Sequence, residues 1–331
     1  MVLSNADYDA LMREYEETRD RHRREQEASV QAAEERIPGL AALTDELRSA
    51  SLSAARQKLA NANADTRWLA ERTALITARK RQLLLAHGLS ADALTIRYDC
   101  PVCRDTGYVN GKPCLCFRKK VAKRLSLGLE GETFADSTDF SHFSYEWYSA
   151  TIIDESAGKT QRWLAENAVR RAKQFTQNIG QAGNNLFLHG NVGVGKTYLL
   201  HCIAGKLLSE GCPVYYFDAG GLFDLLADAA FRRNGRTARE SDMVTQCEVL
   251  LIDDLGTEYT NTFVGTELFR LINERGNAGL STAISSNLDP DGIGRLYGER
   301  ISSRIFESYV TARMAGSDIR MQKKQKSLLK F

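Results

Sequence analysis

One glycine-rich segment constrains this chain more than any other feature of the sequence. Residues 190–197 read GNVGVGKT, which matches the pattern G-x-x-x-x-G-K-[ST]. An apolar run at 185–190 precedes the segment, and a helix-forming sequence begins at Lys196. A strand, a loop and a helix in this order direct the N–H groups of the loop and of the helix N-terminus toward one point, where they can surround phosphate groups. The segment therefore predicts a nucleotide-binding α/β domain.

The residue types within the loop assign individual roles. Its glycines let the backbone curl around the phosphates, the lysine reaches the β- and γ-phosphates, and the Thr197 hydroxyl ligates Mg²⁺. A chance glycine-rich turn is the alternative, and the flanking strand and helix argue against it. We expect ATP and Mg²⁺ as cofactors, held by Gly190, Asn191, Val192, Gly193, Val194, Gly195, Lys196, Thr197 and Tyr198.

From about residue 156 the sequence alternates between helical patterns and short apolar runs. Strands are expected at 185–190, 213–219, 249–255 and 281–287, with helical segments between them. Strands that alternate with helices predict a parallel sheet covered on both faces.

Polar residues end two of these predicted strands. Asp253 ends a buried run in EVLLIDDLG and is expected to coordinate Mg²⁺. Asp254 follows, where a carboxylate can polarise the water that attacks the γ-phosphate. Its alternative is a loop or helix-cap role, and Glu258 is a rival base. Asn287 ends the run STAISSN and could orient the same water, or could simply mark a turn.

The first half of the chain has a different character. Residues 1–97 are expected to form a helical domain, either a small bundle or a partner-binding arm, broken at Pro38-Gly39 and stopped near His87-Gly88. A cysteine-rich segment follows at 98–120, and an aromatic linker at 121–155 leads to the ATPase domain at 156–331.

Four of the seven cysteines are grouped in the cysteine-rich segment. Two closely spaced pairs, separated by a glycine-containing stretch that can form a hairpin, suit a closed tetrahedral zinc site. Unlinked or redox-active cysteines are the alternative, and His87 is a possible substitute ligand. The expected zinc ligands are Cys100, Cys103, Cys114 and Cys116.

Composition excludes some classes of protein. The net charge is only +2, so nucleic-acid binding must depend on local patches, such as the arginines at 232, 233, 236 and 239. A solvated helix end is the alternative for that patch. The sequence contains no run of 18 or more apolar residues and no apolar signal core at its N-terminus. A cytoplasmic location and no membrane partner are expected.

The glycine-rich loop together with LLIDDLG, SSN, GERISSRIF and GSDIR resembles the AAA+ ATPases. Within that group the chain is most similar to bacterial replicative helicase loaders of DnaC/DnaI type, with transposition helpers of IstB type as near kin. The resemblance implies an AAA+ P-loop ATPase with a parallel sheet, preceded by a helical N-terminal domain with a small zinc knuckle.

Several residue roles follow from this resemblance alone. Asn287 corresponds to the sensor-1 residue and Arg320 to the sensor-2 arginine. Arg304 corresponds to the arginine finger that acts on a neighbouring subunit, with Arg300 as an alternative; without the resemblance, a surface ion pair would be the simpler interpretation of either. The implied partners are a replicative DNA helicase, single-stranded DNA and further copies of the chain.

The second motif reads Asp-Asp where many AAA+ proteins have Asp-Glu. The shorter carboxylate reaches less far, so we expect weak ATPase activity that DNA or a partner stimulates. A transposition helper and a P-loop small-molecule kinase remain the competing functions.

Overall fold

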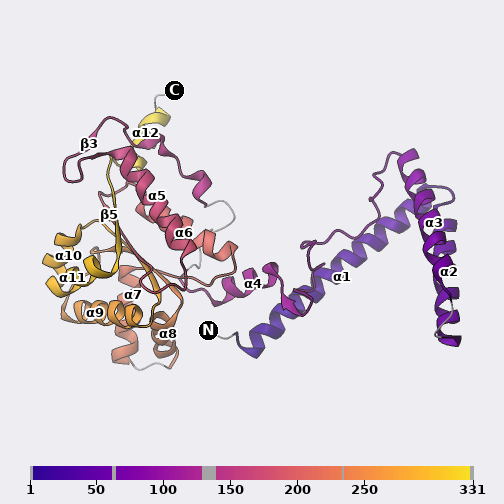
Figure 1. Ribbon diagram of the computed structural model, residues 1–331, viewed down its shortest axis with the longest axis horizontal. Helices are drawn as coiled ribbons and strands as arrows, with labels where there is room; N and C mark the ends of the chain where they lie inside the picture. The colour runs from indigo at the N-terminus through magenta and orange to yellow at the C-terminus, as the bar shows by residue number, and fades with distance from the viewer. Residues whose placement is uncertain (1–2, 62–64, 129–138, 233–234, 329–331) are drawn as a thin grey trace. The chain divides into compact units, whose positions relative to one another are not determined.

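The computed structural model describes residues 3–61, 65–128, 139–232 and 235–328, and side chains are described in these ranges except at 232–238. Apart from the first three residues, the chain divides into two compact units, Ser4–Cys114 and Leu115–Phe331 (Figure 1). No helix among the described residues is long and apolar enough to cross a membrane.

Three helices form most of the unit Ser4–Cys114: α1 (Asn5–Arg36), α2 (Leu40–Ala60) and α3 (Arg67–Ala86). The predicted break is confirmed, because α1 ends before Pro38 and Gly39 precedes α2 with φ at +84°. Leu40 packs there in a small core with Ile37 and Leu84. The predicted stop is also confirmed, since α3 ends at Ala86 and Gly88 has φ at +76°.

The cysteine-rich segment contains the predicted hairpin, which consists of β1 (Tyr108–Val109) and β2 (Lys112–Pro113). Asn110 and Gly111 between the strands have φ at +51° and +74°, the two positive values that a two-residue hairpin turn of type I′ requires. The turn reverses the chain between the two cysteine pairs.

The unit Leu115–Phe331 is built on a five-stranded parallel sheet in the order β6-β7-β8-β5-β9. The predicted parallel sheet is confirmed, and all four expected strands are present. The edge strand β9 was not predicted. The strands are β5 (Asn185–Gly190), β6 (Tyr215–Asp218), β7 (Val249–Leu255), β8 (Ser281–Ser286) and β9 (Val310–Met314).

Helices cover both faces of the sheet, as expected (Figure 1). Along β5 the buried side chains alternate: Leu186 and Leu188 pack with α6, whereas Phe187 packs with α7 and α9 on the other face. The helices are α4 (Leu115–Leu125), α5 (Gln161–Gln177), α6 (Lys196–Ser209), α7 (Ala219–Ala227), α8 (Gly235–Gln246), α9 (Thr262–Asn277), α10 (Pro290–Tyr297), α11 (Glu299–Ser308) and α12 (Ile319–Leu328).

Short elements that were not predicted precede α5 and follow α7. The 3₁₀ turns η1 (Phe140–His142) and η2 (Tyr145–Trp147) lead into a hairpin of β3 (Ile153–Asp154) and β4 (Lys159–Thr160). Arg313 of β9 donates to both carboxylate oxygens of Asp154 at 2.9 and 3.0 Å, which holds the pKa of Asp154 at about 2. A π-helical turn, η3 (Asp228–Arg232), follows α7.

A buried arginine joins α9 to two other elements of the sheet region. Arg275 is only 1% exposed, and its guanidinium donates to the carbonyls of Val244, Cys247 and Ser281 at 3.0, 2.8 and 2.7 Å. Two of these carbonyls lie at the end of α8, where a cation satisfies groups that the helix leaves unpaired.

Replacing Arg275 by Leu is expected to lower the free energy of unfolding by about 3–5 kcal/mol, because several buried carbonyls lose their donor at once. Arg270→Leu on the same helix is the control, since Arg270 is a partly exposed residue that pairs with Glu267 and Glu274. Its loss should cost at most about 1 kcal/mol. Chemical denaturation measures both, and equal losses would contradict the role assigned to Arg275.

Candidate nucleotide site and metal site

A cavity of about 900 Å³ opens at the carboxyl ends of the central strands. It brings together most of the residues that the sequence singled out. The cavity lining includes Val192, Gly193, Gly195, Lys196, Thr197, Tyr198, Asp253, Asp254, Asn287 and Arg320. Three predicted residues of the loop are not part of this lining: Gly190, Asn191 and Val194. Their carbonyl groups accept hydrogen bonds from two side chains that are, Lys196 and Tyr148.

The loop between β5 and α6 needs glycine at two positions for steric reasons. A Cβ at Gly190, where φ is +143°, would lie 1.8 Å from the carbonyl oxygen of Met314 on β9. At Gly193, where φ is +73°, it would lie 2.2 Å from Cγ of Asp318. Glycine therefore lets the loop pack against the end of β9 and the start of α12.

Lys196 links the loop to the neighbouring strand end. Its ammonium group donates to the carbonyls of Gly190 and Asn191 at 2.9 and 2.7 Å, and to Oδ1 of Asn287 at 2.7 Å. Burial lowers the pKa of Lys196, and the carboxylates of Asp254 and Asp253 oppose that shift. The arrangement brings the Lys196 ammonium group and the Asn287 amide together in the cavity lining.

The two aspartates at the end of β7 occupy different environments. Asp253 is buried and accepts hydrogen bonds from the hydroxyls of Tyr216 (2.7 Å) and Ser285. Such fixed partners orient a carboxylate toward a metal ion. Asp254 is half-buried with φ at +52°, and burial together with the nearby Asp253 raises its pKa.

The structure separates the two rival bases. Glu258 accepts hydrogen bonds from the backbone N–H of Gly256 at 2.9 Å and from the hydroxyl of Tyr297. It is not part of the cavity lining, whereas Asp254 is. Of the two, Asp254 is therefore the carboxylate that faces the cavity, and its role as the base stays a prediction.

Sequence reasoning missed an aromatic wall of the site. His142, Phe143, Trp147 and Tyr148 line the cavity, and the Tyr148 hydroxyl donates to the carbonyl of Val194 at 2.6 Å. The sequence signal for this wall was the high number of aromatic residues in FSHFSYEWY, residues 140–148. The sequence alone does not show that this segment packs against the glycine-rich loop.

Two predicted arginines have different positions. Arg320 on α12 lines the cavity together with Lys323. Arg304 lies on α11 outside the lining, where it donates to Oδ1 of Asn273 at 2.6 Å and pairs with Glu307 at 3.2 Å. Its action on a second copy stays a prediction.

Of the predicted arginine patch, Arg239 is exposed. The side chains of Arg232, Arg233 and Arg236 lie outside the described residues.

The four predicted cysteines come together, with their sulfur atoms all within 4.8 Å of one another. The sulfurs of Cys100 and Cys114 are 3.8 Å apart. Zinc–sulfur bonds of about 2.3 Å in a tetrahedron require sulfur atoms about 3.8 Å apart, so the cluster fits zinc. Among the described residues His87 is not part of this group. Bound zinc would be held by four thiolates with no open position, as in a structural site.

Comparison with known proteins agrees with this geometry. The family model for the bacterial DnaA ATPase domain matches residues 158–312. Residues 158–312 are therefore similar to the ATPase domain of DnaA, and part of the chain is similar to DnaC proteins. The predicted fold class and the predicted resemblance to DnaC-type proteins are thereby confirmed.

Similarity to individual proteins is confined to part of the chain. It is 32% identical over 130 residues to the chromosomal replication initiator protein DnaA of Pseudothermotoga lettingae, covering 39% of this chain and 29% of that protein. It is 21% identical over 140 residues to the replicative helicase loader DnaC of Escherichia coli K12, covering 42% and 57%. A crystal structure of the DnaC helicase loader matches with a TM-score of 0.42 and 23% identity, covering 46% of this chain and 90% of that one. The chain thus spans well under two thirds of either curated relative's length.

Replacing Lys196 by Ala is expected to weaken ATP binding by at least about tenfold, because a hydrogen bond to a charged group contributes roughly 1.5–3 kcal/mol. Binding of a fluorescent ATP analogue measures the effect. Lys206→Ala is the control on the same helix, since Lys206 is a partly exposed residue that lies outside the cavity lining and pairs with Glu210 at 2.8 Å. Unchanged binding in the Lys196 variant would contradict the site.

Asp254→Asn and Glu258→Gln separate the two rival bases. The Asp254 variant should bind ATP normally but lose roughly 10²–10⁴-fold in turnover, the contribution typical of a general base. The Glu258 variant should keep most of the turnover, since its side chain can retain both hydrogen bonds. Steady-state phosphate release measures both, and the reverse order would exclude Asp254 as the base.

Proposed function

We propose that this protein is an ATP-dependent loader, which holds a replicative DNA helicase and delivers it to single-stranded DNA during replication initiation. The observation that carries the proposal is the single cavity that combines Lys196, the two aspartates, Asn287 and Arg320 in a DnaA and DnaC type ATPase domain. The relatives named helicase loader DnaC support the same role.

In this proposal, Asp253 and Thr197 hold Mg²⁺, and Asp254 activates the attacking water. Asn287 orients that water, while Arg320 contacts the phosphates of its own subunit. Arg304 from a neighbouring copy completes the site, and its guanidinium would stabilise charge that develops on the γ-phosphate. The short side chain of Asp254 reaches less far toward the attacking water than a glutamate would, which favours slow hydrolysis that DNA or a partner stimulates.

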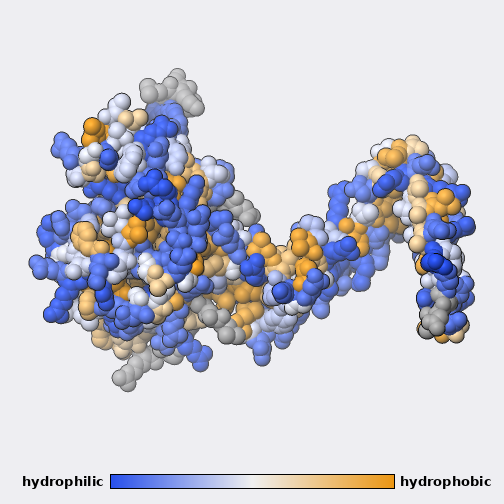
Figure 2. Space-filling model, in the orientation of Figure 1, coloured by the Kyte–Doolittle hydropathy of each residue, from blue (hydrophilic) through white to orange (hydrophobic). Residues whose placement is uncertain are grey.

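The N-terminal helices would bind the helicase. Several apolar side chains of α2 and α3 are exposed, and Figure 2 shows hydrophobic patches among the hydrophilic surface of these helices. Leu52 and Leu59 of α2 are 54% and 88% exposed. They are seven residues apart and so lie on one face of the helix. Such a face offers a partner an apolar contact that the unit itself does not use.

Single-stranded DNA would bind the ATPase unit near the exposed Arg239 and the other arginines of its segment. A basic patch neutralises phosphates regardless of base sequence, so binding there should weaken steeply with added salt.

A helicase pull-down and a loading assay on circular single-stranded DNA test the proposal together. Lys196→Ala should still capture the host replicative helicase but fail to load it. The double variant Leu52→Glu/Leu59→Glu should bind ATP normally but lose helicase capture. Ser53→Glu, at an exposed position on a different side of α2, is the control and should behave as the unmodified protein. No helicase capture by the unmodified protein, with or without ATP, would overturn the proposed function.

A further inference from the structure

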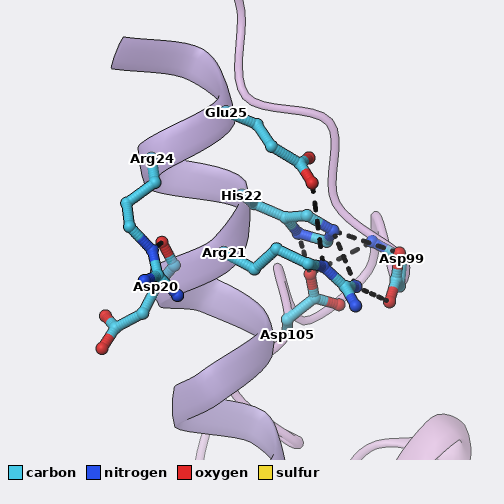
Figure 3. Close-up of polar contacts among 7 residues, drawn as sticks. All are labelled: Asp20, Arg21, His22, Arg24, Glu25, Asp99 and Asp105. Carbon is cyan, nitrogen blue, oxygen red and sulfur yellow. Dashed lines mark hydrogen bonds and ion pairs between the residues drawn. The ribbon is translucent and has the colours of Figure 1, made fainter. Parts of the chain in front are cut away.

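A buried histidine–aspartate pair joins α1 to the cysteine-rich segment. His22 is only 7% exposed although it belongs to a helix of otherwise charged and polar character. Its Nδ1 lies 3.2 Å from Oδ2 of Asp105, which is 1% exposed (Figure 3). Burying a polar side chain costs free energy unless the side chain is hydrogen-bonded, so His22 and Asp105 each hold the other in position.

Asp105 also holds the first cysteine of the metal cluster. Its Oδ1 accepts the backbone N–H of Cys100 at 2.7 Å, and its Oδ2 accepts that of Asp99 at 3.1 Å. Its own φ of +55° is uncommon for a residue other than glycine. One carboxylate therefore connects the turn that carries Cys100 with the imidazole on α1.

The charged side chains around this pair are exposed, so they stabilise the contact between α1 and the cysteine-rich segment less than His22 and Asp105 do. Asp99 lies 3.3 Å from Nε2 of His22 and 3.3 Å from Arg21, but the side chains of Asp99 and Arg21 are both more than half exposed. Exposed ion pairs contribute at most about 1 kcal/mol. Figure 3 shows Arg24 on the opposite side of α1 from Asp99 and Asp105.

Two further contacts place α1 along the segment before and within the cluster. The hydroxyl of Tyr108 in β1 donates to that of Tyr8 at 3.3 Å. The amide of Gln26 donates to the carbonyl of Leu94 at 3.1 Å. His22 lies between these two contacts along α1. Its contact with Asp105 differs from them because both of its side chains are buried.

We propose that His22 and Asp105 form an outer layer of the metal site, which couples metal binding by the four cysteines to the docking of α1. Asp105 positions the Cys100 turn for the metal, and His22 keeps Asp105 in place. Outer-layer partners of metal ligands act in this way, and their loss typically lowers metal affinity by 10–100-fold. Because coupling is reciprocal, bound metal also stabilises α1 on the cluster. The proposal rests on the zinc site and not on the loader function.

Zinc affinity of the full chain, measured by competition with a chromophoric chelator, tests this coupling. His22→Phe keeps an aromatic ring of similar size but removes its nitrogen atoms, and it should raise the apparent zinc dissociation constant by at least about tenfold. Arg24→Gln on the other side of the helix is the matched control and should leave that constant unchanged. The thiolate-to-cobalt absorption bands of the Co²⁺-loaded protein should change in the His22 variant and not in the control.

Hydrogen exchange of the backbone amides measures the reverse effect, that of bound metal on the docking of α1. In the unmodified protein, removing the metal should raise exchange in peptides covering residues 8–26. In His22→Phe these peptides should exchange faster even when metal is bound. Asp105→Asn, which keeps an oxygen for the Cys100 N–H but weakens the imidazole contact, provides a milder variant with the same directions of change if His22→Phe does not fold.

The outcomes separate the two claims. An unmodified protein that binds no zinc would overturn both the metal site and the coupling. Stoichiometric zinc in the unmodified protein, with equal affinity and equal exchange in the His22 and Arg24 variants, would overturn the coupling alone.

Discussion

The position of β8 between β5 and β7 is the constraint on which the nucleotide site depends. In a parallel sheet, three neighbouring strands end at the same edge. The loop with Lys196 follows β5, Asn287 follows β8, and Asp253 and Asp254 end β7. The 2.7 Å contact between Lys196 and Asn287 is the direct result of that strand order. The buried cores on both faces hold the strands in register and thereby fix the site.

Local sequence patterns were sufficient to predict most of the fold. Buried runs such as NLFLHG and VLLIDDL, with loop or turn residues after them, gave strands at the expected residues, and the cluster of four cysteines formed as its spacing indicated. The strand β9 escaped prediction because its five residues, VTARM, alternate apolar with polar side chains and lack the continuous apolar run by which the other strands were recognised. Two-residue strands such as β3 carry too little pattern to be recognised.

The rest of the site could not be predicted because it depends on contacts between distant residues. Tyr148 reaches the loop at Val194, and Tyr216 and Ser285 hold Asp253 from two different strands. Neither tyrosine position carries a motif of its own, and the motif SSN, which contains Ser285, does not indicate a contact with Asp253. The different surroundings of Asp254 and Glu258 likewise depend on a distant residue, because the Tyr297 hydroxyl donates to the Glu258 carboxylate from another helix.

The proposed function requires that ATP in this cavity is hydrolysed at a site that two copies of the chain complete together. Mixing two inactive variants tests it most directly. Asp254→Asn lacks the base but carries Arg304, whereas Arg304→Ala has an intact cavity but cannot complete that of its neighbour. Each variant alone should be nearly inactive, and an equimolar mixture should regain ATPase activity. A mixture no more active than the sum of its components, or an Arg304→Ala protein with normal turnover on its own, would contradict the claim.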